Sequence, residues 1–461
     1  MTRAADVVIV GAGIAGVAAA HHLAVHHRLR PVLVDERPPL SLTSDKSTEA
    51  YRNFWPGPDA AMVRFMNRSI DLLEGLAEAT GNVFRLNRRG YVFATASPAR
   101  AAELTALAGS VAAMGAGPLR IHDGGPDDRA PYPPPSAGPW RDQPVGIDLL
   151  RDPALIRKHF PYVAADTQAI LHARRCGWLS GQQLGMHLLE TARAAGAALV
   201  AGRVTAVDLA GGRVAGVRVE TRGGVERLGT ERLVLAPGPH LPAAARLLDL
   251  ALPVFAERHH KIAMEDHLRV VPRDAPFLIW DDPQRLEWSA EEAAALGADP
   301  ALRWMLEPFP AGVHTRPEGA SPDSRTLLVL WSYDCAPAPV VFPLPEPPHY
   351  AELVLRGMAR MVPGLAAYRE RLPRAVVDGG YYLKTRENRP LIGPLPVGGA
   401  FVSGAYSGFG IMAACAGGEL VAAHVAGAPL PEYAPAFRPD RYDDPDYVAR
   451  IEAWGATTGQ I

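Results

Sequence analysis

The sequence contains little lysine. Among its 47 basic residues, only Lys46, Lys158, Lys261 and Lys384 are lysines, and all the others are arginines. We attribute this bias to codon usage across the genome, but it restricts any lysine-dependent chemistry to four positions. The formal net charge is -2, so the chain has no excess of positive charge for binding nucleic acid or an anionic membrane.

Cysteines and long apolar runs are also scarce. Cys176, Cys335 and Cys415 are far apart and odd in number, so they indicate neither a disulfide framework nor a zinc site. The 15 histidines show no metal-binding spacing, and we predict no metal. No uninterrupted apolar run reaches the length of about 18 residues that predicts a membrane span. An early strand leaves no room for a signal peptide, so we expect a cytoplasmic protein.

The N-terminal segment predicts a nucleotide site. The apolar run Asp6–Val10 predicts a strand buried on both faces, and a second buried strand that ends in acidic residues is predicted at residues 31–37. Between them lies a GxGxxG pattern that opens a helix. Its first glycine permits a tight turn, the second lets the backbone approach a pyrophosphate, and the third lets the helix pack closely. The predicted phosphate loop comprises Gly11, Gly13, Ile14, Ala15 and Gly16.

An acidic residue at the end of the second strand is expected to bind the ribose of the nucleotide. Asp35 directly follows the strand, and Glu36 comes next. We favour Asp35 and keep Glu36 as the alternative. Arg37 completes this part of the predicted cofactor site.

The length of 461 residues exceeds what one hydrophobic core usually serves. We predict an α/β fold in which a Rossmann-like nucleotide-binding domain receives an inserted α+β substrate domain, built on a mostly antiparallel sheet. The nucleotide domain is assigned residues 1–80, 150–250 and 377–461, and the substrate domain residues 81–149 and 251–376. The Pro/Gly-rich segment 116–145 is predicted to be a long loop, either a lid or interface element or a surface insertion.

Two segments favour FAD over NAD as the nucleotide. The segment SLTSDKSTEAYRNFWPG (41–57) places hydroxyl groups, an arginine and aromatic residues after the second strand. A second glycine-rich strand-turn-helix pattern recurs near the C-terminus. A flavin dinucleotide needs contacts along its whole length, and distant chain segments supply them, whereas a nicotinamide dehydrogenase usually continues through regular βα repeats.

Three sequence segments resemble the D-amino-acid oxidase/glycine oxidase superfamily, and within it the sarcosine oxidase-like branch. They are VVIVGAGIAGVAAAHHLA…PVLVDERPP, GRVTAVDL with ERLVLAPGPH, and TRENRPLIGP…FVSGAYSGFGIMAACAGGELVAAHVAG. The resemblance covers most of residues 5–427. It implies that FAD is also contacted by Ser44, Ser47, Thr48, Val204, Gly238, Gly404, Gly408, Phe409, Gly410, Ile411 and Met412.

The chain departs from the pattern of this branch at the positions that attach FAD or activate oxygen. Gly380 stands where sarcosine oxidases have the flavin-linked cysteine, and residues 40–57 contain no histidine that would link FAD instead. We therefore predict non-covalent FAD. The strand RTLLVLWSYD lacks the oxygen-activating lysine, so a dehydrogenase that passes electrons to a carrier is modestly favoured over an oxidase. Lys261 or Lys46 is a possible spatial substitute.

The resemblance implies oxidation of the C–N bond of an amine or amino acid. Hydride transfer to flavin N5 would give an imine, which water hydrolyses. Arg52 matches the arginine that holds the substrate carboxylate, because a guanidinium pairs with a carboxylate through two bonds. The second anchor, a lysine, is replaced by Met412, so a more apolar pocket is expected. The alternative role of Arg52 is an ion pair with Asp45, Glu49 or Asp59.

Further pocket candidates carry a weaker signal. An aromatic wall or ordinary core packing is predicted for Tyr51, Trp331, Tyr333, Tyr382 and Phe409. His259, His260 and Lys261 open a strand where a histidine would serve as a base or pack between domains, and His314 and Arg316 lie on another pocket strand. Two alternative functions remain open: a flavin-dependent 2-hydroxy acid or alcohol oxidoreductase that uses such a base, and a flavoprotein subunit with FAD in a non-catalytic role. The electron acceptor is either O2 or a redox carrier.

Overall fold

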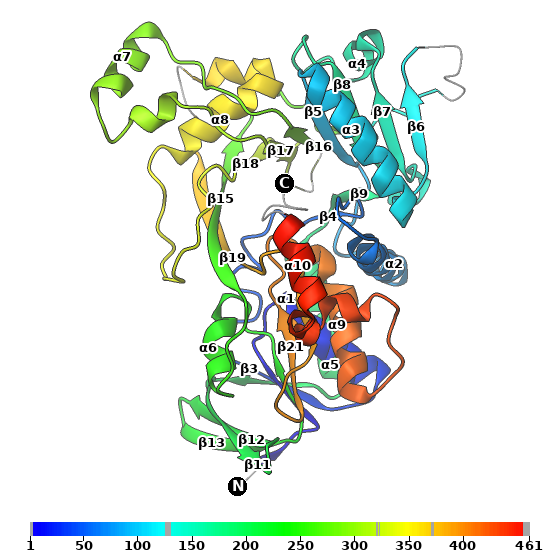
Figure 1. The fold of residues 1–461 in the computed structure, drawn as a ribbon, viewed down its shortest axis with the longest axis vertical. Helices are drawn as coiled ribbons and strands as arrows, with labels where there is room; N and C mark the ends of the chain where they lie inside the picture. Colours follow the sequence, from blue (N-terminus) through cyan, green and yellow to red (C-terminus); the bar gives the residue numbers. More distant parts are fainter. Residues whose placement is uncertain (1–2, 125–130, 320, 322, 370–372, 455–461) are drawn as a thin grey trace.

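The computed structural model describes residues 3–124, 131–319, 321, 323–369 and 373–454. In Figure 1 the molecule is elongated, with a six-stranded sheet and its helices in the lower part and a nine-stranded sheet in the upper part. The long strands β15 (Phe255–Glu265) and β19 (Val376–Lys384) run from the upper part toward the lower one. This arrangement confirms the predicted α/β fold with a Rossmann-like part.

The six-stranded sheet carries the glycine-rich turn. All its neighbouring strands are parallel except the last pair, which is antiparallel. The inner strands β2 (Val7–Val10) and β14 (Leu233–Leu235) consist of continuous apolar residues, almost all of them buried, as is usual for strands covered on both faces, whereas the edge strand β10 (Ala198–Ala201) is partly exposed. The strand order is β10 (Ala198–Ala201), β3 (Pro31–Asp35), β2 (Val7–Val10), β14 (Leu233–Leu235), β21 (Ala400–Gly404) and β20 (Leu391–Pro394).

Alternate residues of these strands face two different cores. Val7 and Ile9 of β2 pack in a core with α1 (Ile14–His21), α2 (Ala61–Ala79), α5 (Gly181–Ala194) and α9 (Gly410–Ala426). Val8 points to the opposite face, where it packs against a four-stranded sheet and α6 (Leu241–Arg246). The strand order of that sheet is β1 (Arg3–Ala4), β13 (Gly224–Gly229), β12 (Arg213–Thr221) and β11 (Arg203–Ala210).

The nine-stranded sheet is mostly antiparallel, as predicted; only the pairs β16–β5 and β6–β7 are parallel. Its strand order is β19, β15, β18 (Thr326–Leu330), β17 (Val313–Pro317), β16 (Phe277–Trp280), β5 (Tyr91–Thr95), β8 (Ala169–Ala173), β7 (Ile147–Leu150) and β6 (Leu119–His122). Helices α3 (Pro98–Val111), α4 (Pro153–His159), α7 (Ala290–Ala298) and α8 (Tyr350–Met361) lie in the same part of the molecule. Strands β4 (Ala50–Arg52) and β9 (Cys176–Trp178) form a small separate sheet, and α10 (Pro445–Trp454) follows near the C-terminus.

Two strands lie on the other side of the predicted domain boundaries. β8 falls within residues 150–250, which were assigned to the nucleotide domain, but it pairs with β5 and β7 in the nine-stranded sheet. β19 begins at the predicted boundary of 377–461 and belongs to the same sheet. The reason is that strand pairing between distant segments is not visible in local apolar patterns. Residues 455–461 of the predicted domain lie outside the described residues.

The segment 116–145 is only partly a loop. It contains β6, which pairs with β7 in parallel, and a short 3-10 helix at Trp140–Asp142. The hydroxyl of Tyr132 lies 2.8 Å from Nδ1 of His172, which fixes this part of the segment against the sheet. Its proline and glycine content hid the short strand from sequence analysis. Residues 125–130 of this predicted loop lie outside the described residues.

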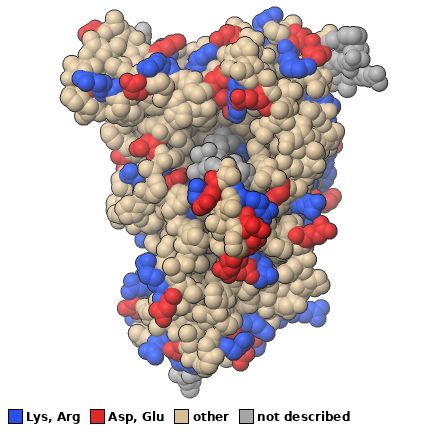
Figure 2. All heavy atoms as spheres, in the orientation of Figure 1, with Lys and Arg blue, Asp and Glu red and all other residues tan. Residues whose placement is uncertain are grey.

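Charged residues are distributed without a large patch of one sign on the face in Figure 2, where basic and acidic side chains alternate. This distribution agrees with the formal charge of -2. Among the described residues, the helices include none with the length and apolar character needed to cross a membrane.

Helix α1 contains a buried histidine that makes stability depend on pH. Burial lowers the pKa of His21 from 6.5 to about 4, with His26 and His187 adding to the effect. The unfolded chain therefore binds a proton more readily, and stability falls as pH drops from 6.5 toward 4. We expect about 2 kcal/mol of destabilisation from this residue between about pH 7 and pH 5.

Urea unfolding at these two pH values measures the expected loss. His21→Gln should reduce the pH dependence, whereas His267→Gln, at an exposed histidine, should leave it unchanged. An identical slope in the wild type and His21→Gln would show that His21 is not responsible.

Candidate functional site

The turn between β2 and α1 requires its first and last glycines. Gly11 has φ +103°, and a Cβ there would lie 2.4 Å from the carbonyl oxygen of Ala236, the residue that follows β14. A Cβ on Gly16 would lie 2.1 Å from the carbonyl oxygen of Gly11. At Gly13, by contrast, the nearest atom is Oγ of Ser44 at 3.4 Å. Gly11 and Gly16 therefore shape the turn, while Gly13 borders open space.

The acid at the end of β3 supports the same turn. Oδ2 of Asp35 accepts a hydrogen bond from the N–H of Ala12 at 2.7 Å, and Oδ1 accepts one from the N–H of Arg37 at 2.9 Å. A carboxylate has further lone pairs, so Asp35 keeps acceptor capacity for a ribose hydroxyl. Glu36 and Arg37 are exposed. The geometry thus favours Asp35, which stays a prediction.

The hydroxyl-rich segment after β3 crosses the start of α1. Oγ of Ser44 accepts a hydrogen bond from the N–H of Ile14 at 3.0 Å. The hydroxyl of Thr43 donates to the carbonyl oxygen of Tyr381 on β19 at 3.2 Å. The carbonyl oxygen of Thr48 accepts two bonds from the guanidinium of Arg316, at 3.0 and 2.7 Å. The segment is therefore fixed between helix α1 and the nine-stranded sheet.

A second glycine-rich turn joins β21 to α9. Ala405 and Ser407 both have positive φ values, 56° and 49°, which are uncommon for residues with a Cβ. The Oγ atom of Ser407 is buried and has no hydrogen-bond partner among the described residues. A Cβ on Gly408 would lie 2.3 Å from the ring of Tyr382. Strained backbone and an unsatisfied buried hydroxyl are features of ligand sites.

These two turns enclose a cavity with about 640 Å³ of empty space. Both helices that begin there, α1 and α9, begin without a side-chain cap on their own N-cap residue. Helix N-termini favour negative charge. The cavity is lined by Gly13, Ile14, Ala15, Thr43, Ser44, Ser47, Ala236, Gly238, Pro239, Tyr381, Tyr382, Leu383, Ser403, Gly404, Ala405, Tyr406, Ser407, Gly408, Gly410 and Ile411.

These residues fit a dinucleotide flavin. The α1 turn suits a pyrophosphate, and the start of α9 would stabilise the negative charge of a reduced flavin. The hydroxyl of Ser407 offers a donor without another partner among the described residues. Ten of the predicted cofactor residues lie here: Gly13, Ile14, Ala15, Ser44, Ser47, Gly238, Gly404, Gly408, Gly410 and Ile411.

A second cavity, of about 610 Å³, adjoins the first. The two share Tyr382, Ser407 and Gly408 as lining residues. The second cavity is otherwise lined by Thr48, Ala50, Arg52, Tyr91, His259, His260, Phe277, His314, Leu330, Ser332, Asn388, Phe409 and Met412. It contains four of the residues predicted for the substrate site, namely Arg52, His260, Tyr382 and Met412.

Arg52 brings a buried positive charge to the second cavity. Its residue is 5% exposed, its guanidinium lies 4.6 Å from the ring centroid of Trp55, and burial lowers its pKa. The acids proposed as its alternative partners contact other groups. Asp45 pairs with Lys46 at 2.8 Å, Glu49 accepts from the N–H of Gly181 at 2.7 Å, and Asp59 pairs with Arg389 at 2.6 Å. Each of the three acids thus has a contact of its own, and Arg52 lines the second cavity.

Three histidines line the second cavity. His259 stacks on Tyr382 with 3.8 Å between ring centroids, and His260 has its Nε2 3.0 Å from the carbonyl oxygen of Pro345. His314 donates from Nδ1 to the carbonyl oxygen of Gly312 at 2.7 Å, and burial lowers its pKa to about 4. His314 is therefore neutral near pH 7, with Nε2 as an acceptor.

The predicted aromatic wall is only partly at the cavities. Tyr382 and Phe409 line the second cavity. Tyr51 is fully buried and donates to the carbonyl oxygen of Asn87 at 2.6 Å. Trp331 and Tyr333 pack in a separate aromatic cluster with Phe309 and Tyr350.

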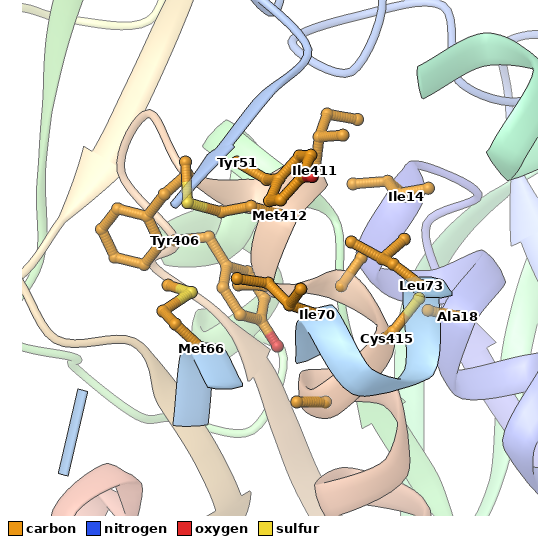
Figure 3. Close-up of a cluster of buried hydrophobic side chains, with 14 of the residues drawn as sticks. Ile14, Ala18, Tyr51, Met66, Ile70, Leu73, Tyr406, Ile411, Met412 and Cys415 are labelled. Atoms are coloured by element: carbon orange, nitrogen blue, oxygen red, sulfur yellow. The ribbon is translucent and has the colours of Figure 1, made fainter. Parts of the chain in front are cut away.

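Figure 3 shows where Met412 lies. It projects from α9 beside Tyr51 and Ile411, within the apolar cluster formed with α1 and α2. Met412 is 6% exposed and also lines the second cavity. This side of the cavity is therefore apolar, as expected from the loss of a lysine anchor.

Lys261 does not line either of the two cavities. Its Nζ donates to the carbonyl oxygen of Lys46 at 2.5 Å and lies 3.4 Å from Asp378. These contacts hold the hydroxyl-rich segment against β19. They do not support the predicted catalytic role of Lys261.

Other predicted cofactor residues lie beyond the lining of the two cavities: Gly11, Gly16, Asp35, Glu36, Arg37 and Val204. Sequence analysis missed Tyr91, Phe277, Asn388 and Ser407, which do line them. Tyr91 and Phe277 lie in ordinary buried strands with no distinguishing signal. Ser407, between two glycines of the recurring C-terminal pattern, could have been identified.

The sequence matches the family model for DAO, FAD-dependent oxidoreductases, over residues 6–424. The chain belongs to this family. The match confirms the resemblance to the D-amino-acid oxidase/glycine oxidase superfamily and identifies FAD as the cofactor of the family. The narrower placement in the sarcosine oxidase-like branch stays a prediction. No curated protein matches the sequence.

Solved structures of low sequence identity share the fold of this DAO-family chain. L-proline dehydrogenase from P. horikoshii aligns with a TM-score of 0.71 and 18% identity, over 96% of this chain and 99% of that one. Glycine oxidase from Geobacillus kaustophilus aligns with a TM-score of 0.68 and 18% identity, over 93% and 96% of the two chains. Amadoriase I from Aspergillus fumigatus, a fructosyl amine:oxygen oxidoreductase, aligns with a TM-score of 0.65 and 15% identity, over 98% of this chain and 92% of that one.

Non-covalent FAD predicts a simple chemical result. Gly380 lies beside the hydroxyl-rich segment, because a Cβ on it would be 3.4 Å from Cβ of Lys46 and 3.5 Å from Cα of Thr43. As a glycine it offers no side-chain nucleophile there. Acid precipitation should leave a colourless pellet and release intact FAD into the supernatant. A yellow pellet after washing would show a covalent link.

Proposed function

We propose that the protein oxidises the C–N bond of an amine or amino acid, giving an imine that water hydrolyses. The observation that carries this proposal is the buried guanidinium of Arg52 in the second cavity, which shares Tyr382, Ser407 and Gly408 with the first cavity, where we expect FAD to bind. FAD, when bound, supplies the hydride acceptor. The residues of the second cavity would bind and orient the substrate.

Arg52 would bind and orient a substrate carboxylate. A buried cation is stabilised by an anion that brings two oxygen acceptors, and its planar donors fix the orientation of that anion. Met412 and Phe409 line the same cavity with apolar surface, so the substrate is expected to carry one carboxylate together with an apolar or bulky amine. Holding the substrate in one geometry contributes to catalysis without a side-chain base, provided the amine binds in its neutral form.

A second function is favoured by the histidines of the cavity. His259 and His314 both line it, and the low pKa of His314 keeps its imidazole neutral. A neutral imidazole is a suitable base for a hydroxyl proton. This arrangement supports oxidation of a 2-hydroxy acid or alcohol as the alternative, and a flavoprotein subunit without catalysis is the third possibility.

An anaerobic substrate panel distinguishes these functions. Secondary amines and amino acids should bleach the oxidised flavin, and 2-hydroxy acids should not. Bleaching by hydroxy acids alone would replace the first function by the second. If no compound in a broad panel bleached the flavin, the non-catalytic role would be favoured.

For the electron acceptor, we propose a redox carrier rather than O2. The described strand β18 carries no lysine, and Nζ of Lys261 is directed at the carbonyl oxygen of Lys46. In air-saturated buffer, turnover should release little peroxide, and an artificial acceptor dye should raise the rate. Peroxide formed in equal amount to the oxidised substrate would identify an oxidase.

We further propose that the protein is cytoplasmic and that it binds no nucleic acid. The formal net charge of -2 supports the second of these proposals.

A further inference from the structure

One cluster of side chains in the substrate part of the molecule combines three types of metal ligand. Glu257, His259 and Cys335 each offer one ligand atom, and these atoms all lie within 4.8 Å of one another. Oε2 of Glu257 lies 3.2 Å from Nε2 of His259, and Sγ of Cys335 lies 3.6 Å from the same nitrogen.

Strand geometry explains how the three residues meet. Glu257 and His259 are two residues apart on β15, so their side chains share one face of the sheet. The chain after β18 runs back alongside β15, because Glu257 forms a β-bridge with Pro337 and the N–H of Ala338 donates to the carbonyl oxygen of Ala256 at 2.8 Å. This bridge places Cys335 beside the two strand residues.

Two of the ligand separations, those from Nε2 of His259, are close to the edges of a tetrahedral zinc site. Sγ of Cys335 also lies 3.8 Å from Nδ1 of His259, so its side chain has to turn toward the Nε2 side to coordinate an ion there. Zinc binds nitrogen and oxygen at about 2.0–2.2 Å and sulfur at about 2.3 Å, which separates tetrahedral ligands by about 3.3 Å for N···O and about 3.5 Å for N···S. We propose that Glu257, His259 and Cys335 bind a zinc-like divalent transition-metal ion. Three protein ligands leave a fourth position for water or another small ligand.

The surroundings give such an ion an access route. Cys335 is exposed, and both Cys335 and His259 line a separate cavity of about 370 Å³ with Ser332 and Tyr333. His259 also lines the second cavity and stacks on Tyr382. Metal binding would therefore fix the imidazole that forms part of the proposed substrate site.

The charges of the cluster change when the metal binds. Burial lowers the pKa of His259, so its imidazole is neutral and available as a ligand. The Cys335 thiol loses one proton to solvent as the metal–sulfur bond forms, because the thiolate is the metal ligand. The Nζ atom of Lys384 lies 3.2 Å from Oε2 of Glu257. Without a metal, the carboxylate of Glu257 has Lys384 and His259 as partners. The alternative to a metal site is therefore that these three side chains only stabilise the fold.

Metal content of the purified full-length flavoprotein tests the proposal. After loading with Zn²⁺ and dialysis, the wild type should retain about one equivalent, as expected for one site with three ligands. Cys335→Ser and Glu257→Gln should weaken binding by more than the roughly 100-fold that loss of an outer-shell partner costs. The control variants Asp334→Asn and Cys415→Ser should keep the metal. Asp334→Asn removes only a charge next to Cys335, and Cys415 lies in the apolar core around α9.

Loading with Co²⁺ gives an independent readout. A tetrahedral site produces ligand-field absorption in the red, where oxidised flavin does not absorb, and its thiolate contribution should disappear in Cys335→Ser. Flavin content of each variant shows that it is folded. Retention of metal by Cys335→Ser equal to that of the wild type, or no retention by the wild type, would overturn the proposal. Neither result depends on the substrate that the enzyme oxidises.

Discussion

Replacing Arg52 with leucine should raise KM for a carboxylate-bearing substrate by about 30-fold or more. Removing one member of a buried charged pair costs about 2–5 kcal/mol, and about 1.4 kcal/mol corresponds to a tenfold change. Arg52 is 5% exposed and lies in the second cavity, which adjoins the first. KM for an amine of similar size without a carboxylate should change little.

Arg52→Lys is the matched control for this prediction. Lysine keeps the charge but loses the planar pair of donors, so it should raise KM less than leucine does. Because the guanidinium lies over Trp55 at 4.6 Å, both variants need a measurement of bound FAD to show that the site is intact. An unchanged KM for the carboxylate substrate in Arg52→Leu would remove Arg52 from the substrate site.

The parts of the site that could be predicted from the sequence depend on local chain geometry. Gly11 and Gly16 are required by contacts with β14 and with the turn itself, and the strand-turn-helix pattern announces that requirement directly. Asp35 was predicted from its place at the end of the second strand of the same motif, and Ser44 was implied by the family resemblance. They lie 23 and 30 residues from Ala12 and Ile14, and each accepts a hydrogen bond from the turn.

The parts that could not be predicted depend on pairing between distant strands. Tyr91 and Phe277 reach the second cavity because β5 pairs with β16 in parallel, and neither strand differs in composition from other buried strands. The cluster with Cys335 is a similar case. His259 and Cys335 are 76 residues apart, so the absence of metal-binding spacing in the sequence did not test for a site formed by tertiary contacts.

Replacing Gly408 should have the second large effect on activity, because this residue lines both cavities. A Cβ there would lie 2.3 Å from Cε2 of Tyr382, which stacks on His259 with 3.8 Å between ring centroids. Gly408→Ala therefore has to displace the Tyr382 ring or the turn before α9, and overpacking of this kind costs about 1–3 kcal/mol. Since Tyr382 and Gly408 line both cavities, we expect weaker FAD binding and a loss of kcat/KM of about tenfold to a hundredfold.

A second substitution separates the steric effect from a general loss of stability. In the double variant Gly408→Ala with Tyr382→Leu, the smaller side chain should relieve the contact and restore part of the FAD affinity lost in Gly408→Ala. Gly75→Ala on α2, where a Cβ meets no atom within 4 Å, should leave FAD affinity unchanged. The measurement is the dissociation constant of FAD, followed by the recovery of flavin fluorescence on dilution. If the double variant bound FAD no better than Gly408→Ala, the contact with Tyr382 would not be the reason that glycine is needed at this position.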